Sequence, residues 1–121
     1  MIIRHAFPEK NWMKMDKNVA VDSSLTDGAF RLYAYLCGLR NGSDFNDNYI
    51  MKGLNITKNT LAKRKRELTK FDLILVDQIR PRQYAIYIGH STFRASKVKE
   101  AWEKDEKHND LFSNEILITD E

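Results

Sequence analysis

The sequence predicts a single α+β domain in which helices come first, a β-hairpin follows and a last helix closes the chain. Apolar residues recur at about 3.6-residue spacing from Leu25 to Phe71, and from Leu73 to Ile88 the spacing falls to about 2. A length of 121 residues is enough for one hydrophobic core. The expected layout is a three-helix core with a β-hairpin over residues 1–91, including an N-terminal extension, and a C-terminal helix and acidic tail over residues 92–121.

Composition argues against several classes of protein. No apolar run approaches the roughly 18 residues that cross a bilayer, and no signal peptide is recognisable, so we expect a cytoplasmic protein without a membrane partner. Cys37 is the only cysteine, and His5, His90 and His108 show no metal-ligand spacing. No nucleophile with an adjacent base and no phosphate-binding glycine loop is present. We therefore expect neither a metal or other cofactor nor an enzyme.

The N-terminal segment has little regular spacing. Ile2–Ile3 and Trp12–Met15 are expected as short strands, and Asn18–Val21 as either a strand or a helical turn. A packed segment is favoured over a disordered basic arm on DNA, because Phe7 and Trp12 are costly to leave in water.

A central helix is predicted next, capped by Thr26 or Asp27 and running to about Arg40, where Asn41–Gly42 ends it. Two adjacent apolar stripes at helical spacing make it the expected centre of the core. Their members are Leu25, Ala29, Leu32 and Leu36 in one stripe and Phe30, Tyr33, Ala34 and Cys37 in the other.

Two further helices are predicted around a tight turn. Asn46 or Asp47 can cap the first, whose inward residues are Ile50 and Leu54. Asn55 suits a left-handed turn position, because asparagine tolerates that backbone conformation. Thr57 is the expected N-cap of the second helix, which runs to about Lys70. A helix-turn-helix is the arrangement that this pattern indicates.

The second helix of this pair has two different faces. On a helical wheel, Leu61 and Leu68 point inward with Phe71 at the edge of that face. The opposite face carries Asn59, Lys63, Arg66 and Lys70, while Arg64 and Lys65 flank the apolar stripe. Such a face suits the major groove of DNA, where Asn pairs with adenine, Arg or Lys with guanine, and other cations with phosphate. The competing interpretation is an ordinary solvated face, against which stands a run of cations opposed only by Glu67.

Positive charge is concentrated in the same region. Residues 51–90 carry nine Lys/Arg and three Asp/Glu, whereas residues 1–50 carry six of each and residues 91–121 carry five and eight. This distribution is the electrostatic footprint expected of a nucleic-acid-binding surface. Lys52, exposed near the turn, is expected within reach of a phosphate.

A hairpin is predicted from two β-rich runs, Leu73–Ile79 and Tyr84–Ile88. They are joined by Arg80-Pro81-Arg82-Gln83, in which proline stiffens the turn and two arginines project. A polar tip alone is a weak signal. Directly after a basic helix, it resembles a wing that straddles the DNA backbone or enters the minor groove.

A last helix is expected from Ser91 or Thr92 to about His108, with Ala95, Val98 and Trp102 on one face. That stripe either folds back on the domain or meets its copy in a homodimer. The acidic tail at 109–121 can form a strand, bind a protein partner as a peptide, or cover the basic face.

Taken together, the chain resembles the winged helix-turn-helix DNA-binding domains of plasmid, conjugative-element and phage proteins of Gram-positive bacteria. The resemblance covers about Asn11 to Ile88 and is carried by the segments W-M-K-M-D, L-T-D-G-A-F-R-L-Y-A-Y-L and G-L-N-I-T-K-N-T-L, followed by the hairpin. It implies groove contacts by Lys58, Asn59, Thr60, Lys63 and Arg64, phosphate contacts by Lys52 and Thr57, and wing contacts by Arg80 and Arg82. Together with Arg66, Lys70 and Gln83, these form the predicted DNA-binding set.

Two functions follow as expectations. The first is a sequence-specific protein of double-stranded DNA, acting as an accessory factor at a plasmid or conjugative-element origin of transfer or replication, or as a small regulator of transcription. The alternative is a winged-helix module that recruits a protein partner through its C-terminal helix and tail, without binding DNA.

Overall fold

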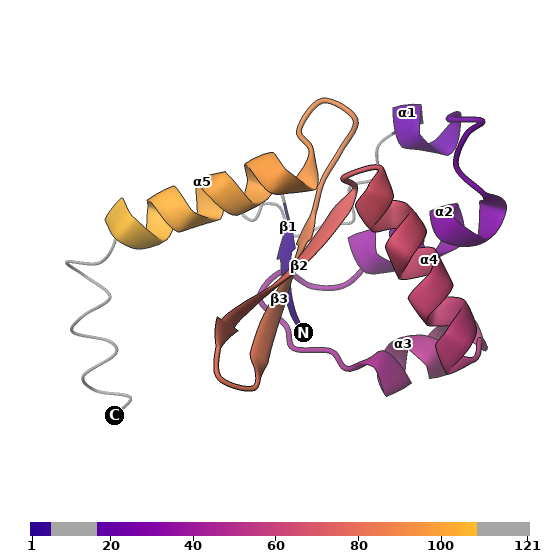
Figure 1. The fold of residues 1–121 in the computed structure, drawn as a ribbon, viewed down its shortest axis with the longest axis horizontal. Coiled ribbons are helices and arrows are strands. Elements are labelled where there is room, and N and C mark those ends of the chain that lie inside the picture. Colours follow the sequence, from indigo (N-terminus) through magenta and orange to yellow (C-terminus); the bar gives the residue numbers. More distant parts are fainter. Residues whose placement is uncertain (6–16, 109–121) are drawn as a thin grey trace.

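A computed structural model of the chain describes residues 1–5 and 17–108, with the side chains of 105–108 excepted. In this part it contains five helices and a three-stranded sheet, so the α+β class is confirmed (Figure 1). The helices are α1 Lys17–Ala20, α2 Asp27–Cys37, α3 Asp47–Leu54, α4 Lys58–Lys70 and α5 Ala95–His108, and the strands are β1 Ile2–His5, β2 Ile74–Arg80 and β3 Gln83–Ile88.

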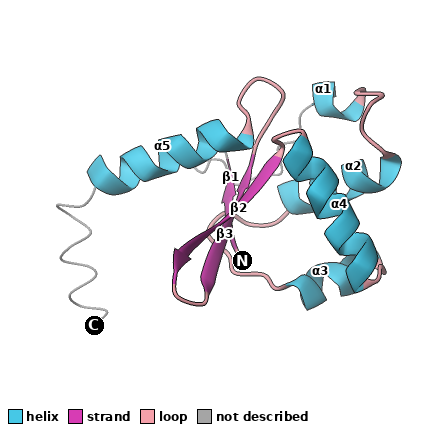
Figure 2. Cartoon of the chain, in the orientation of Figure 1, coloured by secondary structure: helices cyan, strands magenta, loops and turns pink. Residues whose placement is uncertain are grey.

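The sheet separates two layers of helices. The strand order is β1-β3-β2, with β3 antiparallel to β2 and parallel to β1. Helices α2, α3 and α4 lie on one side of the sheet and α5 on the other (Figure 2). The larger apolar core fills the space on the first side, and a smaller core of Ala85, Tyr87 and Val98 lies beneath α5.

Strand β1, at the start of the chain, forms the edge of the sheet beside β3. Ile3 pairs with Ile86 of β3, and both side chains are fully buried. The loop before α3 runs along the outer side of β1, where the Ile3 amide donates to the Ser43 carbonyl at 2.9 Å. The predicted Ile2–Ile3 strand is therefore confirmed, and its outer edge is partly covered by this loop.

Helix α2 begins as predicted and ends earlier. The Thr26 side chain accepts from the Ala29 amide, and the helix stops at Cys37 with Gly38 as C-cap. The predicted end near Arg40 was wrong: the Gly38 amide still donates to the Ala34 carbonyl at 3.2 Å, but the Leu39 amide turns to the Leu36 carbonyl, three residues back, at 3.1 Å. The two predicted apolar stripes of this helix lie in the core, with Leu32 and Tyr33 fully buried.

The predicted pair of helices around a tight turn is confirmed. Asn46 caps α3, with its side chain accepting from the Tyr49 amide at 2.8 Å. Asn55 has φ 54°, in the left-handed region, and Thr57 caps α4. Ile50 and Leu54 of α3 are buried, as are Leu61 and Leu68 of α4.

Helix α5 begins later than predicted. It starts at Ala95 rather than at Ser91 or Thr92, because its first turn is capped by a residue from outside the helix. The Asp72 carboxylate accepts from the Ser96 amide at 3.1 Å, and the Asp72 carbonyl accepts from the Ala95 amide at 2.8 Å. Asp72 follows α4 in a left-handed conformation (φ 56°), so the end of one helix fixes the start of the other.

The apolar stripe of α5 packs on the sheet of its own chain. Ala95 and Val98 are buried, and the Trp102 indole N–H donates to the His5 carbonyl at 3.1 Å. The Arg4 guanidinium lies 5.0 Å from the Trp102 ring centroid and 5.5 Å from that of Tyr87. The fold-back alternative is the one observed, so a homodimer through Trp102 would have to displace these contacts.

The N-terminal expectations are met in part. Asn18 to Ala20 belong to the helical turn α1, and Val19 is buried in the main core. The expected strand at Trp12–Met15 and the packing of Phe7 lie outside the described residues, as does the tail at 109–121.

Tyr33 provides a test of the core. Its hydroxyl donates to the Gly89 carbonyl at 2.7 Å, and the side chain is fully buried. We expect Tyr33→Phe to lower the free energy of unfolding by about 1–3 kcal/mol, because the buried carbonyl loses this hydrogen-bond donor. Urea denaturation measures the change. Tyr84→Phe is the matched control: Tyr84 is 46% exposed, and a change of comparable size there would contradict the assignment.

Candidate nucleic-acid interface

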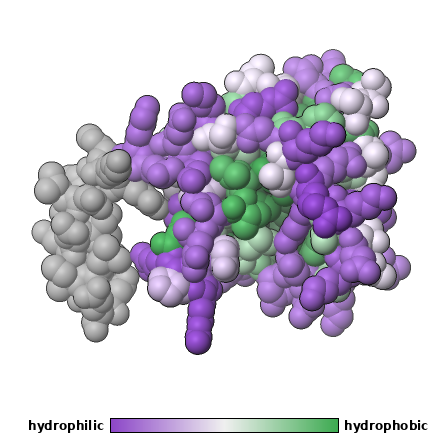
Figure 3. All heavy atoms as spheres, in the orientation of Figure 1, coloured by the Kyte–Doolittle hydropathy of each residue, from purple (hydrophilic) through white to green (hydrophobic). Residues whose placement is uncertain are grey.

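The residues predicted to bind DNA gather on α3, α4 and the hairpin tip, and most of them are exposed. The exposed ones are Lys52, Thr57, Lys58, Asn59, Lys63, Arg66, Lys70, Arg80 and Arg82, and the partly buried ones are Thr60, Arg64 and Gln83. In Figure 3 hydrophilic side chains cover the surface over α4, beside an apolar patch that lies over the strands.

Helix α4 sorts its charged residues between its two sides. Glu67, the only acidic residue in the basic run, accepts from both the amide and the hydroxyl of Thr26, at 2.8 and 2.9 Å, and so ties α4 to the start of α2. Lys65 donates to the Asp47 carboxylate at 2.6 Å and ties α4 to the start of α3. Both side chains hold the helices together and leave the outer face without a carboxylate of its own.

The outer face of α4 consequently carries cations without partners. Lys63, Arg66 and Lys70 on this face, and Lys58 at the start of the helix, are all exposed, and none of them forms an ion pair within residues 1–5 and 17–104. On α5, by contrast, the exposed Lys97 pairs with Glu100 at 3.4 Å. Cations gathered on one helix face attract a polyanion strongly when no carboxylate of the same protein neutralises their charge.

Arg64 is placed differently from the other predicted contacts. Its guanidinium crosses Gly28 of α2, where a Cβ atom would lie 2.7 Å from the Arg64 Nε. Its Nη1 atom is buried without a hydrogen-bond partner. The structure therefore places this side chain between two helices, outside the exposed face, and a groove contact by Arg64 requires it to turn outward.

The start of α4 is organised by two threonines. The Thr57 hydroxyl accepts from the Thr60 amide at 3.3 Å and donates to the Thr60 hydroxyl at 3.0 Å. Both hydroxyls thus serve the cap. The Thr60 amide is thus already bonded, while the amides of Lys58 and Asn59 have no carbonyl partner inside the helix and remain available to an anion.

The hairpin tip holds a residue in a costly conformation. Pro81 and Arg82 form the turn, and Arg82 has φ 62°. Within residues 1–5 and 17–108 the other non-glycine residues with positive φ are Asn55 and Asp72, of the types that tolerate it best. An arginine there costs about 1 kcal/mol that glycine would avoid. This cost suggests a task for the exposed Arg82 side chain other than making the turn.

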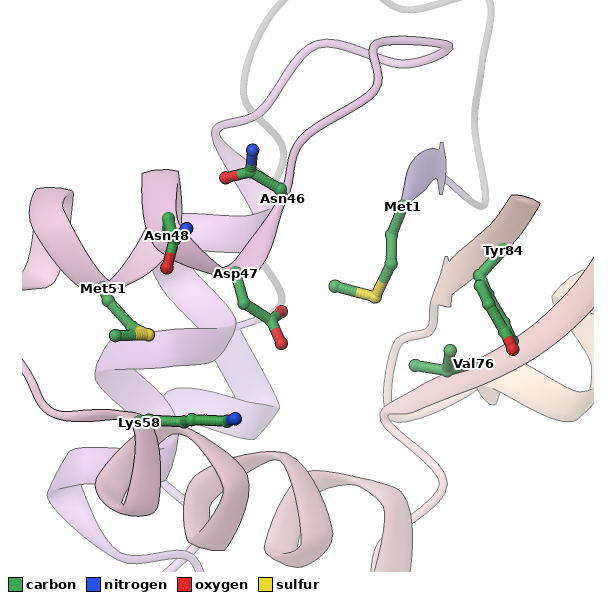
Figure 4. Close-up of a pocket in the computed structure, with 8 residues that line it drawn as sticks. All are labelled: Met1, Asn46, Asp47, Asn48, Met51, Lys58, Val76 and Tyr84. Carbon is green, nitrogen blue, oxygen red and sulfur yellow. The ribbon is translucent and has the colours of Figure 1, made fainter. Parts of the chain in front are cut away.

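A groove of about 530 Å³ separates the helix pair from the hairpin. It is lined by Met1, Asn46, Asp47, Asn48, Met51, Lys58, Val76 and Tyr84. Figure 4 shows the side chains of Met1, Asp47 and Lys58 pointing toward the space between α3 and the strands. Because Lys58 and the hairpin border the same groove, the start of α4 and the hairpin are neighbours.

Sequence reasoning missed this groove. Val76 and Tyr84 were recognised as strand residues, but they are 39% and 46% exposed because the hairpin extends past the helices that cover its base. The alternation of Ile74 and Val76 on one side of β2 was the available signal, since it assigns Val76 to the side that faces the helices.

Other kinds of site find little support in the described part of the chain. No group of three or more His, Cys, Asp or Glu side chains there could hold a metal ion. None of the helices in that part is long and apolar enough to cross a membrane. Cys37 is buried in the core.

No protein-family model, no curated protein and no solved structure matches this chain. What the basic surface does must therefore be inferred from its own residues.

Proposed function

We propose that this protein binds double-stranded DNA as a winged helix-turn-helix domain, with α4 in the major groove and the β2–β3 hairpin as the wing. From the resemblance of its sequence, we further propose that it serves a mobile element as an accessory factor at an origin of transfer or replication, or as a regulator of transcription. Base edges would be read from Asn59, Lys63 and Arg66, and phosphates held by Lys52, Lys58 and Lys70.

The observation that carries this proposal is the sorting of charge on α4. A helix whose charges serve only solubility pairs opposite signs along its surface. Here Glu67 and Lys65 point to neighbouring helices and bond there, while Lys63, Arg66 and Lys70 remain exposed on the opposite face. The free cations face solvent together, as a polyanionic partner requires.

A second observation supports the wing. The hairpin borders the same groove as Lys58, so its arginine-bearing tip extends from the side of the molecule where α4 begins (Figure 1). A ligand that spans both elements contacts the helix and the hairpin at once. Duplex DNA has the required length and charge.

Salt dependence tests the proposal directly. With four or more phosphates neutralised, the slope of log affinity against log salt is about −3.5 or steeper, so that raising salt from about 50 to 200 mM weakens binding about 100-fold or more. Fluorescence polarisation with a labelled duplex of random sequence measures this. Absence of binding at about 50 mM salt, or a flat slope, refutes the proposal.

Arg82 allows stability and binding to be separated. We expect Arg82→Gly to leave the free energy of unfolding unchanged or raise it by up to about 1 kcal/mol, because glycine adopts positive φ without strain. The same variant should bind duplex DNA several-fold more weakly, since a wing cation is lost. Thermal unfolding and polarisation measure the two effects. Unchanged affinity would remove Arg82 from the interface.

The protein-recruitment alternative is less well supported in one respect. It assigned the apolar stripe of α5 to a partner, and Ala95, Val98 and Trp102 are packed against the sheet instead. Under the DNA-binding proposal this helix has the role of supporting the hairpin from the far side of the sheet.

A further inference from the structure

The groove between α3, the start of α4 and the hairpin is a feature that DNA binding by the outer face of α4 does not explain. Its volume of about 530 Å³ lies in the range of ligand sites. Half of its lining residues are Met1, Met51, Val76 and Tyr84. Exposed apolar surface rimmed by polar residues is typical of an interaction site.

The polar part of the lining defines what the groove can accept. The Lys58 ammonium points into it and has no partner among the described residues, whereas the Asp47 carboxylate is already bound to Lys65 at 2.6 Å. Arg80 and Arg82 add positive charge on the hairpin beside it. The groove therefore suits a segment that carries both apolar and acidic side chains.

Such a segment exists in the same chain. Residues 109–121, which lie outside the described part, contain four acidic residues and no Lys or Arg. The acidic residues are Asp110, Glu115, Asp120 and Glu121, and the apolar ones are Leu111, Phe112, Ile116, Leu117 and Ile118. Their charge is opposite to that of residues 51–90, where nine Lys/Arg stand against three Asp/Glu. The apolar side chains of this segment suit the apolar lining of the groove, and its acidic side chains suit the positive charge of Lys58 and the hairpin arginines.

The segment is also long enough. The Trp102 indole contacts the His5 carbonyl, and β1 runs from His5 back to the groove at Met1. From the rise per residue of a helix and a strand, the path from His108 to Met1 along these elements is roughly 30 Å. Thirteen extended residues reach about 43 Å, and the chain covers about 30 Å only near residue 117, so the residues from Leu117 to Glu121 are the ones that can enter the groove.

We infer that residues 109–121 dock in this groove of their own chain when DNA is absent. Leu117 and Ile118 contact Met51, Val76 and Tyr84, and Asp120 and Glu121 lie near Lys58 and the hairpin arginines. The docked segment then competes with duplex DNA for the start of α4 and for the wing. The competition rests on the proposed DNA-binding function, whereas the docking itself does not.

Docking is tested without DNA, in the full chain. The variant carrying Ile116→Ser, Leu117→Ser and Ile118→Ser keeps every charge of the segment and removes the apolar side chains of the part that reaches the groove. Methyl NMR of ¹³C-labelled Met and Val is expected to show shifts at Met1, Met51 and Val76, with Val98 beneath α5 unchanged. Val76→Ser should reproduce the shift at Met51 from the groove side.

Three outcomes overturn the inference. Groove signals that are the same in the wild-type chain and the triple variant show that the segment lies elsewhere. Equal shifts at Val98 show a general change of fold rather than release from the groove. Shifts that appear only as protein concentration rises show that the segment of a second copy is the occupant.

The effect on DNA has its own measurement. The triple variant should bind a labelled duplex about 3- to 10-fold more tightly than the wild-type chain, and its unchanged charge excludes a simple loss of repulsion. If groove signals shift and affinity does not, the segment docks without covering the DNA surface, and the competition is refuted. If neither protein binds DNA at about 50 mM salt, the proposed function fails while docking is still decided by NMR.

Discussion

Reversing two charges on α4 should abolish DNA binding. In the double variant Lys63→Glu and Arg66→Glu, two exposed cations without partners become carboxylates facing a polyanion. Each lost contact is worth about 1–3 kcal/mol, and repulsion adds to the loss, so we expect affinity to fall at least about 100-fold. The salt slope should become shallower by about two or more. Polarisation with a labelled duplex at several salt concentrations measures both changes.

The matched control reverses two lysines at a distance from α4. Lys97 and Lys104 lie on α5, are exposed, and belong to the opposite side of the sheet. Lys97→Glu with Lys104→Glu makes the same change in net charge, so it should reduce affinity only slightly. Both double variants should keep their free energy of unfolding within about 1 kcal/mol of the parent, because the substituted side chains are exposed. Equal losses of affinity in both would mean that net charge, and no particular face, governs binding.

The helix pair was predictable because its signals are local. Asn46, Asn55 and Thr57 each act on amides or dihedral angles within a few residues of themselves, and all three perform the predicted role. The 3.6-residue spacing of Leu61 and Leu68 likewise needs no knowledge of the rest of the fold. Local chemistry therefore fixed the element that carries the candidate site.

Apart from the end of α2, the errors concern contacts between distant residues. The start of α5 was misplaced because its cap, Asp72, is 24 residues from Ser96 in sequence. The parallel pairing of β1 with β3 joins the beginning and the end of the folded region, and no local pattern announces it. Single-sequence patterns do not show which remote side chain satisfies a helix end.

The candidate site shows the same division. The helical wheel identified Lys63, Arg66 and Lys70 as exposed, and they are. It could not foresee that Gly28 opens space for the Arg64 guanidinium, or that Glu67 bonds to Thr26. The wheel gives a direction, and only the neighbouring helix decides whether a flanking side chain points outward.

Gly89→Ala should be the most destabilising of the conservative substitutions considered. A Cβ atom at Gly89 would overlap the Ala95 nitrogen and the Arg94 carbonyl carbon, which are backbone atoms at the start of α5. The Gly89 amide also donates to the Leu73 carbonyl at 2.8 Å, and its carbonyl accepts from Tyr33. Residue 89 therefore cannot move aside without breaking hydrogen bonds to two other parts of the core.

We expect this variant to lose about 2–3 kcal/mol of unfolding free energy, in the range of overpacked cores, and to melt roughly 10–20 °C lower. Gly28→Ala is the comparison, because its Cβ would meet only the Arg64 side chain, which can shift, and alanine favours the helix by about 1 kcal/mol. Differential scanning calorimetry of both variants measures the difference.

Since the Gly89 clash separates α5 from the sheet, the stability loss should be accompanied by weaker protection of Trp102 from solvent, seen as a red shift of its fluorescence. If Gly89→Ala melts no lower than Gly28→Ala, the end of β3 and the start of α5 are not in close contact. The proposed role of α5 in supporting the hairpin is then contradicted as well.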